Sequence, residues 1–229
     1  MNQTGRTIVK NASVLLISQV STWGLSLVIM IFMTRYLGAT GIGQIHLANS
    51  IWAILAITIE FGMNTYLTKE ISRSPERIDN LLSVSLILRS LLYVGSIFVL
   101  LLYLQFTDYA PVTIAVIFVT GISNLVIQFG MVYRASLEGL ERMEYISVAQ
   151  IVARIFTAVV TIALLLLNYG LIAIVSVGIF ESLINMAIQY TAVRRLRRPK
   201  FYFNWAAAKE MLQKSYPYLI VYIFLVMYM

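Results

Sequence analysis

The sequence predicts an all-α fold, a polytopic bundle of transmembrane helices, and two observations carry this prediction. Hydrophobic residues make up 60% of the 229 residues and charged residues only 12%, whereas soluble domains average roughly 25% charged residues. The apolar residues also gather in stretches that reach the roughly 20 residues a membrane-spanning helix needs. Together these features exclude a soluble globular domain, a disordered chain and a collagen-like repeat.

Six apolar stretches are long enough to cross a membrane, and we expect residues 1–193 to form a six-helix transmembrane lobe. The first stretch is too long for the core of a signal peptide and is followed by further spans, so it is expected to remain in the protein as a helix. The six stretches cover residues 11–34, 43–66, 80–104, 111–136, 145–168 and 170–193.

A seventh apolar stretch, residues 216–229, follows a basic linker at 194–215. Its fourteen residues rise only about 21 Å as a helix, less than the ~30 Å thickness of the hydrocarbon core. We therefore expect 216–229 to be a truncated seventh transmembrane helix in a sequence that continues past Met229. Within the linker, residues 204–212 have the pattern of an amphipathic helix, which either lies in the membrane interface or faces the solvent.

Lysine and arginine residues are distributed unevenly over the expected loops. With the N-terminus inside, fourteen of the 17 basic residues fall in inner segments, Arg35 falls outside, and Arg89 and Arg154 lie within spans. This asymmetry predicts a multi-pass protein of the cytoplasmic membrane whose N-terminus is cytoplasmic. The net charge of +7 is therefore assigned to topology and not to nucleic acid binding. The basic cluster 194–200 also suits anionic membrane lipids.

Polar residues recur at helical spacing in each of the six stretches, which places them on one face of each helix. In the first stretch they are only serine and threonine, which close helix packing explains. The other stretches carry amides or charges, which are costly in lipid and are expected to face protein or a water-filled cavity. These residues include Asn64, Arg89, Asn124, Gln128, Arg154 and Glu181.

Four ionisable residues lie deep within the spans: Glu60, Arg89, Arg154 and Glu181. Each unpaired charge at a helix centre costs roughly 2.5–3.5 kcal/mol, so the four are expected to pair or to contact water. Their depths along the membrane normal permit pairing. Two interpretations stay open: structural ion pairs that lock neighbouring helices together, or charges that line a substrate path.

The sequence contains no recognisable machinery for chemistry. It has no cysteine and a single histidine, His46, which leaves no thiolate or histidine cluster for a metal. Nucleotide-binding loops, nucleophile elbows and zinc-protease motifs are absent from the sequence. We therefore expect a protein that is not an enzyme and has no catalytic residue, metal or cofactor.

Five short motifs carry a resemblance to a known family: TRYLGATGIG (34–43), EFGMN (60–64), TKEISR (68–73), GLERM (139–143) and LQKSYP (212–217). They resemble motifs of the polysaccharide flippases, the O-antigen type of exporter within the multidrug/oligosaccharidyl-lipid/polysaccharide exporter superfamily. The run TRYLGATGIG (34–43) is similar to the first loop of that family. EFGMN (60–64) and TKEISR (68–73) resemble its next motif, GLERM (139–143) its inner loop between helices four and five, and LQKSYP (212–217) the segment before helix seven. The resemblance covers essentially the whole chain.

This resemblance implies two six-helix lobes around a central cavity, of which the chain matches the first lobe and the start of the second. It implies translocation of polyprenyl-diphosphate-linked oligosaccharide, with coupling to H⁺ or Na⁺ and with polysaccharide-assembly proteins as partners. By analogy, the candidate substrate-binding residues are Arg35, Arg89, Arg154, Asn64, Asn124 and Gln128, because guanidinium groups bind phosphate in a bidentate fork. Glu60 and Glu181 are the candidates for ion coupling or charge pairing.

Two other functions remain as alternatives at this point. An ion-coupled small-molecule antiporter of the multidrug and toxin extrusion type shares the architecture, but it needs an acidic cavity for cations. A membrane glycosyltransferase or polymerase needs an acidic aqueous loop for a nucleotide sugar and a metal, whereas the longest loop of this sequence is basic.

Overall fold

The structure, a computed structural model, describes residues 3–196 and 204–228, and these residues confirm the all-α fold. No strand occurs among them. The helices are α1 (Gln3–Glu60), α2 (Met63–Arg73), the 3-10 turn η1 (Pro75–Arg77), α3 (Ile78–Leu104), α4 (Pro111–Gly139), α5 (Met143–Leu166), α6 (Leu171–Leu196) and α7 (Trp205–Tyr228).

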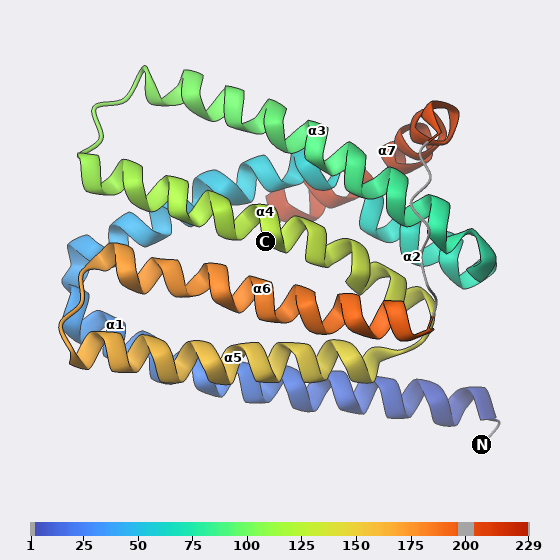
Figure 1. The fold of residues 1–229 in the computed structure, drawn as a ribbon, viewed down its shortest axis with the longest axis horizontal. Coiled ribbons are helices and arrows are strands. Elements are labelled where there is room, and N and C mark those ends of the chain that lie inside the picture. Colours follow the sequence, from blue (N-terminus) through green and yellow to red (C-terminus); the bar gives the residue numbers. More distant parts are fainter. Residues whose placement is uncertain (1–2, 197–203, 229) are drawn as a thin grey trace.

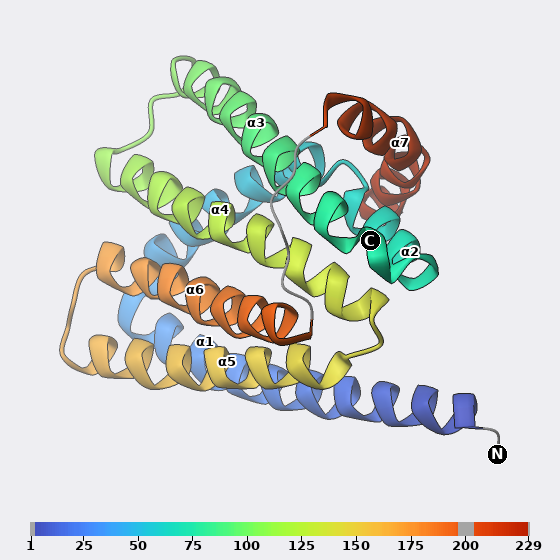
Figure 2. The same cartoon turned by 45° about the vertical axis from the view of Figure 1, so that its right-hand side comes forward.

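Helix α1 contains the first predicted span and most of the second, joined at Gly38. Gly38 alone leaves the helical conformation, with φ 64° and ψ −177°, a region that glycine reaches because it has no Cβ. The chain reverses its direction along the bundle at this point (Figures 1 and 2). The loop expected between residues 34 and 43 is therefore reduced to a break at a single residue.

The second predicted span, 43–66, does not continue as one helix to its end. Helix α1 stops at Glu60, Phe61 (φ 47°) and Gly62 (φ 71°) adopt left-handed conformations, and α2 begins at Met63. A Cβ atom on Gly62 would lie 2.6 Å from the backbone nitrogen of Leu219 and 2.7 Å from the backbone oxygen of Ser215. The break thus lies directly against the backbone of α7, and a larger residue does not fit there.

The predicted spans 80–104, 111–136, 145–168 and 170–193 each coincide with one helix, from α3 to α6. The start of α1, helix α2, the α4–α5 connection and the end of α6 gather at one end of the bundle, on the right in Figure 1. The kink within α1 and the α3–α4 and α5–α6 connections lie at the other end (Figures 1 and 2). Within the described residues, the segments expected to be basic therefore meet at one end of the bundle.

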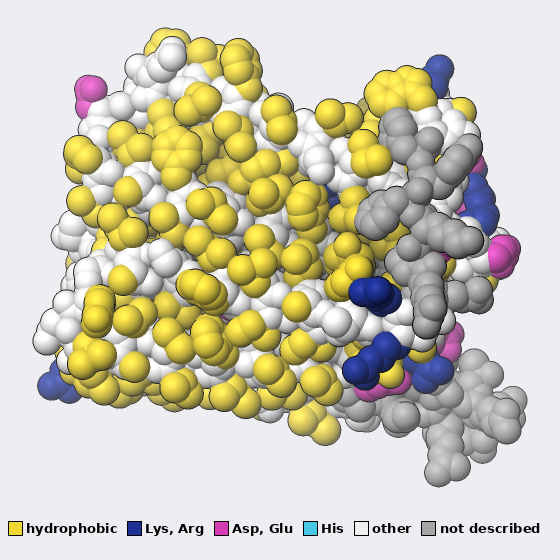
Figure 3. Space-filling model, in the orientation of Figure 1, with side chains coloured by type: hydrophobic (Ala, Val, Ile, Leu, Met, Phe, Trp, Pro, Cys, Tyr) yellow, Lys and Arg dark blue, Asp and Glu magenta, His cyan; other side chains and the backbone are white. Residues whose placement is uncertain are grey.

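The exterior of the bundle is apolar. Five helical stretches among the described residues are long and apolar enough to cross a membrane: Leu16–Glu60, Pro75–Leu104, Pro111–Gly139, Met143–Leu166 and Leu171–Leu196. In the most apolar 18 residues of each stretch, only 11% to 39% of the residues are buried inside the protein. Hydrophobic side chains cover the face shown in Figure 3, and charged side chains lie at its edges. Such a surface suits contact with lipid, as in a multi-pass membrane protein.

The count is five in place of the predicted six complete spans because α1 runs through Gly38 as one helical element, and α7 is not among the five stretches. Helix α7 joins the segment predicted as amphipathic to the apolar stretch that follows, with Pro217 inside the helix. It packs on α2 and α3. Arg197, Arg198 and Lys200 of the predicted basic cluster lie outside the described residues.

Candidate functional site: a polar cavity between four helices

A cavity of about 650 Å³ lies between α1, α4, α5 and α6, within the roughly 300–1,000 Å³ typical of small-ligand sites. Both parts of α1 contribute to its wall, Ile29 and Met33 before the Gly38 break and Asn49 and Trp52 after it. No described residue of α2, α3 or α7 lines it. The cavity is therefore a feature of the four-helix side of the bundle.

Arg154 of α5 and Glu181 of α6 meet in the wall of this cavity. The Nη1 atom of Arg154 lies 3.4 Å from Oε1 of Glu181, and the two side chains are 32% and 26% exposed. Two of the four deep ionisable residues are thus brought together as a half-buried ion pair. Because both side chains keep some exposure to the cavity, either can still meet a ligand.

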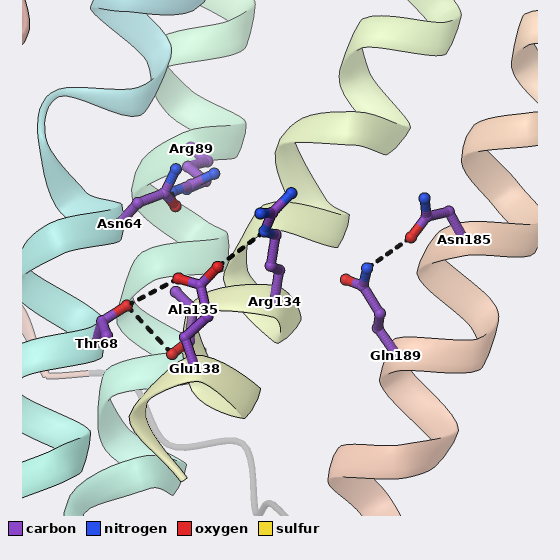
Figure 4. A network of polar contacts seen from close by, with 8 residues as sticks. All are labelled: Asn64, Thr68, Arg89, Arg134, Ala135, Glu138, Asn185 and Gln189. Carbon is purple, nitrogen blue, oxygen red and sulfur yellow. Dashed lines mark hydrogen bonds and ion pairs between the residues drawn. The ribbon is translucent and has the colours of Figure 1, made fainter. Parts of the chain in front are cut away.

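Arg134 of α4, one of the fourteen basic residues expected in inner segments, is a second arginine in the cavity wall. Its Nε donates to Oε1 of Glu138 at 2.9 Å, and Oε2 of Glu138 accepts from the hydroxyl of Thr68 at 3.4 Å (Figure 4). The charged residues among the described lining are Arg134, Arg154 and Glu181. Each of the two arginines in the wall is thus paired with a carboxylate, Arg134 with Glu138 and Arg154 with Glu181.

Three carboxamide side chains also line the cavity: Asn124 on α4, and Asn185 and Gln189 on α6. The Nε2 atom of Gln189 donates to Oδ1 of Asn185 at 2.5 Å (Figure 4). The Oδ1 atom of Asn124 and the Oε1 atom of Gln189 are buried and have no hydrogen-bond partner in the protein. Two acceptors in the wall are thus left for a ligand or for water.

Arg89 belongs to a different cluster, which lies beside this cavity and does not line it. It is fully buried, and its Nη1 donates to the backbone oxygen of Gln128 at 2.6 Å and to Oε1 of the same residue at 3.2 Å. Its Nη2 donates to Oδ1 of Asn64 at 2.5 Å, and Glu60 lies near both Arg89 and Asn64. The cluster ties α3 and α4 to the break between α1 and α2.

The candidate residues from the sequence therefore divide into three groups. Arg154, Glu181 and Asn124 line the cavity, whereas Arg89, Asn64, Gln128 and Glu60 form the buried cluster beside it. Arg35 is exposed, three residues before the Gly38 break, and does not line the cavity.

Trp52, which the sequence analysis did not single out, fixes one wall of the cavity. Its ring stacks on Tyr93 of α3 with centroids 5.4 Å apart, and its Nε1 donates to the backbone oxygen of Ile117 at 2.8 Å. The hydroxyl of Tyr93 donates to the backbone oxygen of Gly121 at 2.7 Å. These contacts hold α1 and α3 against α4, next to the polar lining.

Comparison with protein families gives one match over nearly the full length. A family model described as polysaccharide biosynthesis protein matches residues 8–229. A comparison with curated proteins finds no match. The family match includes all the helices that line the cavity.

Proposed function

The chain belongs to the family of polysaccharide biosynthesis proteins, and from this premise we propose that it is a flippase for lipid-linked oligosaccharide. Its substrate is polyprenyl-diphosphate-linked oligosaccharide, which it moves from the cytoplasmic to the outer leaflet of the cytoplasmic membrane. The N-terminus and the basic end of the bundle face the cytoplasm, in keeping with the distribution of basic residues.

The observation that carries this proposal is the presence of two arginines, Arg134 and Arg154, in the wall of the cavity. A diphosphate is an anion, and an arginine side chain binds phosphate oxygens through two parallel hydrogen bonds. Arg154 is 32% exposed, so its guanidinium group can reach a ligand without unfolding the bundle. A transporter for cationic drugs needs the opposite charge, and its cavity would be expected to hold more carboxylates than arginines.

Glu181 holds Arg154 while the cavity is empty, and the diphosphate takes the place of this carboxylate when substrate enters. The cavity opens alternately to the two sides of the membrane as the substrate passes. A carboxylate that is released from its arginine can take up H⁺ or Na⁺, which makes Glu181 the candidate for coupling to an ion gradient. Polysaccharide-assembly proteins deliver or receive the substrate.

Arg89 has a structural role in this proposal. Because it is buried among Asn64 and Gln128 and does not line the cavity, it positions α3 and α4 against the α1–α2 break. Arg35 lies at the opposite end of the bundle from the basic segments and anchors the helix end at the membrane interface.

Polysaccharide export in cells that lack their own flippase tests the proposal. The protein is compared with its Arg154→Ala and Arg154→Lys variants at matched membrane levels, and Arg195→Ala, an exposed arginine in the last turn of α6, is the control. Arg154→Ala is expected to abolish most export and to leave lipid-linked oligosaccharide on the inner leaflet. Arg154→Lys keeps the positive charge but loses the two parallel hydrogen bonds that a guanidinium group makes to phosphate, so partial export is expected.

Export at the wild-type level by Arg154→Ala would overturn the assignment of Arg154. Resistance to cationic drugs in the same cells, without polysaccharide export, would point instead to the antiporter alternative.

A further inference from the structure

The carboxamide face of the cavity, Asn124, Asn185 and Gln189, has unused hydrogen-bonding capacity. Gln189 is only 3% exposed, and its Oε1 has no partner although its Nε2 is bonded to Asn185. The Oδ1 atom of Asn124 is likewise buried without a partner. Buried polar atoms are nearly always satisfied, so two such acceptors in one cavity indicate a ligand or bound water.

The chemistry of these acceptors selects the kind of group that can satisfy them. A carbonyl oxygen of a carboxamide needs an O–H or N–H donor. A fully ionised diphosphate offers only acceptors, so it matches arginine and not these oxygens. Sugar hydroxyl groups both donate and accept, and they carry no charge that a neutral carboxamide would have to balance.

The carboxamide face adjoins the Arg154–Glu181 pair. Glu181, Asn185 and Gln189 are spaced by four residues on α6, which sets them on one side of the helix at intervals of about 6 Å. All three line the cavity, together with Arg154. A charged site and a neutral polar site therefore lie next to each other in one continuous wall.

We propose that the carboxamide face binds hydroxyl groups of the sugar that is linked to the diphosphate, while Arg154 binds the diphosphate itself. This inference rests on the proposed function and assigns to the cavity a second site of different chemistry. It makes Asn124 and Gln189 residues that select for the sugar-bearing form of the lipid over the bare polyprenyl diphosphate.

Binding to the purified protein in detergent tests this assignment with two probes. One is a short-chain polyprenyl diphosphate without sugar, and the other is the same lipid bearing a disaccharide. The variants are Asn124→Leu and Gln189→Met, which remove the acceptor at similar volume. Gln150→Met on α5 is the matched control, because Gln150 is half-buried and does not line the cavity.

Each variant is expected to weaken binding of the sugar-bearing probe about fivefold, the effect of one lost hydrogen bond. Binding of the sugar-free probe and both affinities of Gln150→Met are expected to stay at wild-type values. Equal losses for the two probes, or no loss for either, would overturn the inference.

The wild-type protein gives a second test, which does not depend on the folding of any variant. It is expected to bind the sugar-bearing probe more tightly than the sugar-free one. Equal affinities would overturn the carboxamide site and leave the proposed function standing. A wild-type protein that binds neither probe would overturn the proposed function itself.

Discussion

Arg154 and Glu181 face each other across the boundary between α5 and α6, with Nη1 3.4 Å from Oε1, inside the wall of the cavity. The pair neutralises two charges at a depth where an isolated charge is costly. It also leaves both groups partly open to the cavity. The same contact can therefore stabilise the empty protein and give way to an anionic ligand.

The two residues are expected to depend on each other for stability. Removing one partner leaves the other charge unpaired. The losses of stability in Arg154→Met and Glu181→Gln should therefore add up to more than the loss in the double variant. For a half-buried pair we expect a coupling energy of about 1–2 kcal/mol, between the values for exposed and buried pairs. The free energy of unfolding of all four proteins in detergent measures this coupling. Additive effects of the two substitutions would show that the pair is not an energetic unit.

Gly121→Ala is expected to destabilise the contact between α1 and α4. A Cβ atom at this position would overlap Cζ2 of Trp52 and lie 2.9 Å from Cε2 of the same ring. Overpacking of this kind costs about 1–3 kcal/mol, and thermal unfolding in detergent measures it. Gly95→Ala is the matched control, because a Cβ there meets nothing within 4 Å. Alanine at 95 should be neutral or stabilising, since it favours the helix. Equal midpoints for the two variants would contradict the packing described for Trp52.

Arg89→Met is expected to lower stability without changing the affinity of the folded protein for the sugar-free diphosphate probe. The substitution leaves Asn64 and Gln128 without their donor, and the loss of a buried charged donor costs about 3 kcal/mol or more. Arg154→Met is expected to show the opposite pattern, with weaker binding and a smaller loss of stability. A loss of binding in folded Arg89→Met would place Arg89 on the substrate path.

Much of the helical fold could be predicted from apolar length, since α3 to α6 begin and end within a few residues of the predicted spans. The breaks at Gly38 and at Phe61–Gly62 could not be placed in the same way, because both depend on the local backbone. At Gly62 the conformation also depends on contact with α7, which is distant in the sequence. Apolar length contains no information on either feature.

The polar stripe of α4 shows why the site was predicted only in part. On α4 the cavity is lined by Asn124, Ile127 and Met131, and Gln128 lies at the edge of this stripe. Asn124 therefore lies at the cavity, whereas Gln128 lies against Arg89. Arg134 lies further along the cavity side of α4, where its charge had been counted with the inner segments. Pairing of Arg154 with Glu181 could be anticipated from the sequence, because the depth of each residue in the membrane can be estimated from the rise of a helix per residue.

The orientation of the bundle is expected to place the α4–α5 connection inside the cell and the α3–α4 connection outside. The natural sequence has no cysteine, so Asp108→Cys and Glu141→Cys each introduce a single thiol at an exposed position. A membrane-impermeant maleimide should label Cys at 108 in intact cells and Cys at 141 only after the cells are opened. Labelling in the reverse order would contradict the positive-inside assignment.

Photocrosslinking in living cells tests most directly whether the cavity holds the lipid-linked oligosaccharide. A photoreactive residue replaces Met186, which lines the cavity on α6, or Phe180 on the same helix, whose side chain is 55% exposed and does not line the cavity. Crosslinking from position 186 is expected to capture polyprenyl-diphosphate-linked oligosaccharide, and crosslinking from position 180 only bulk membrane lipid. Capture of bulk lipid alone from both positions, or equal capture of the oligosaccharide lipid from both, would contradict the account.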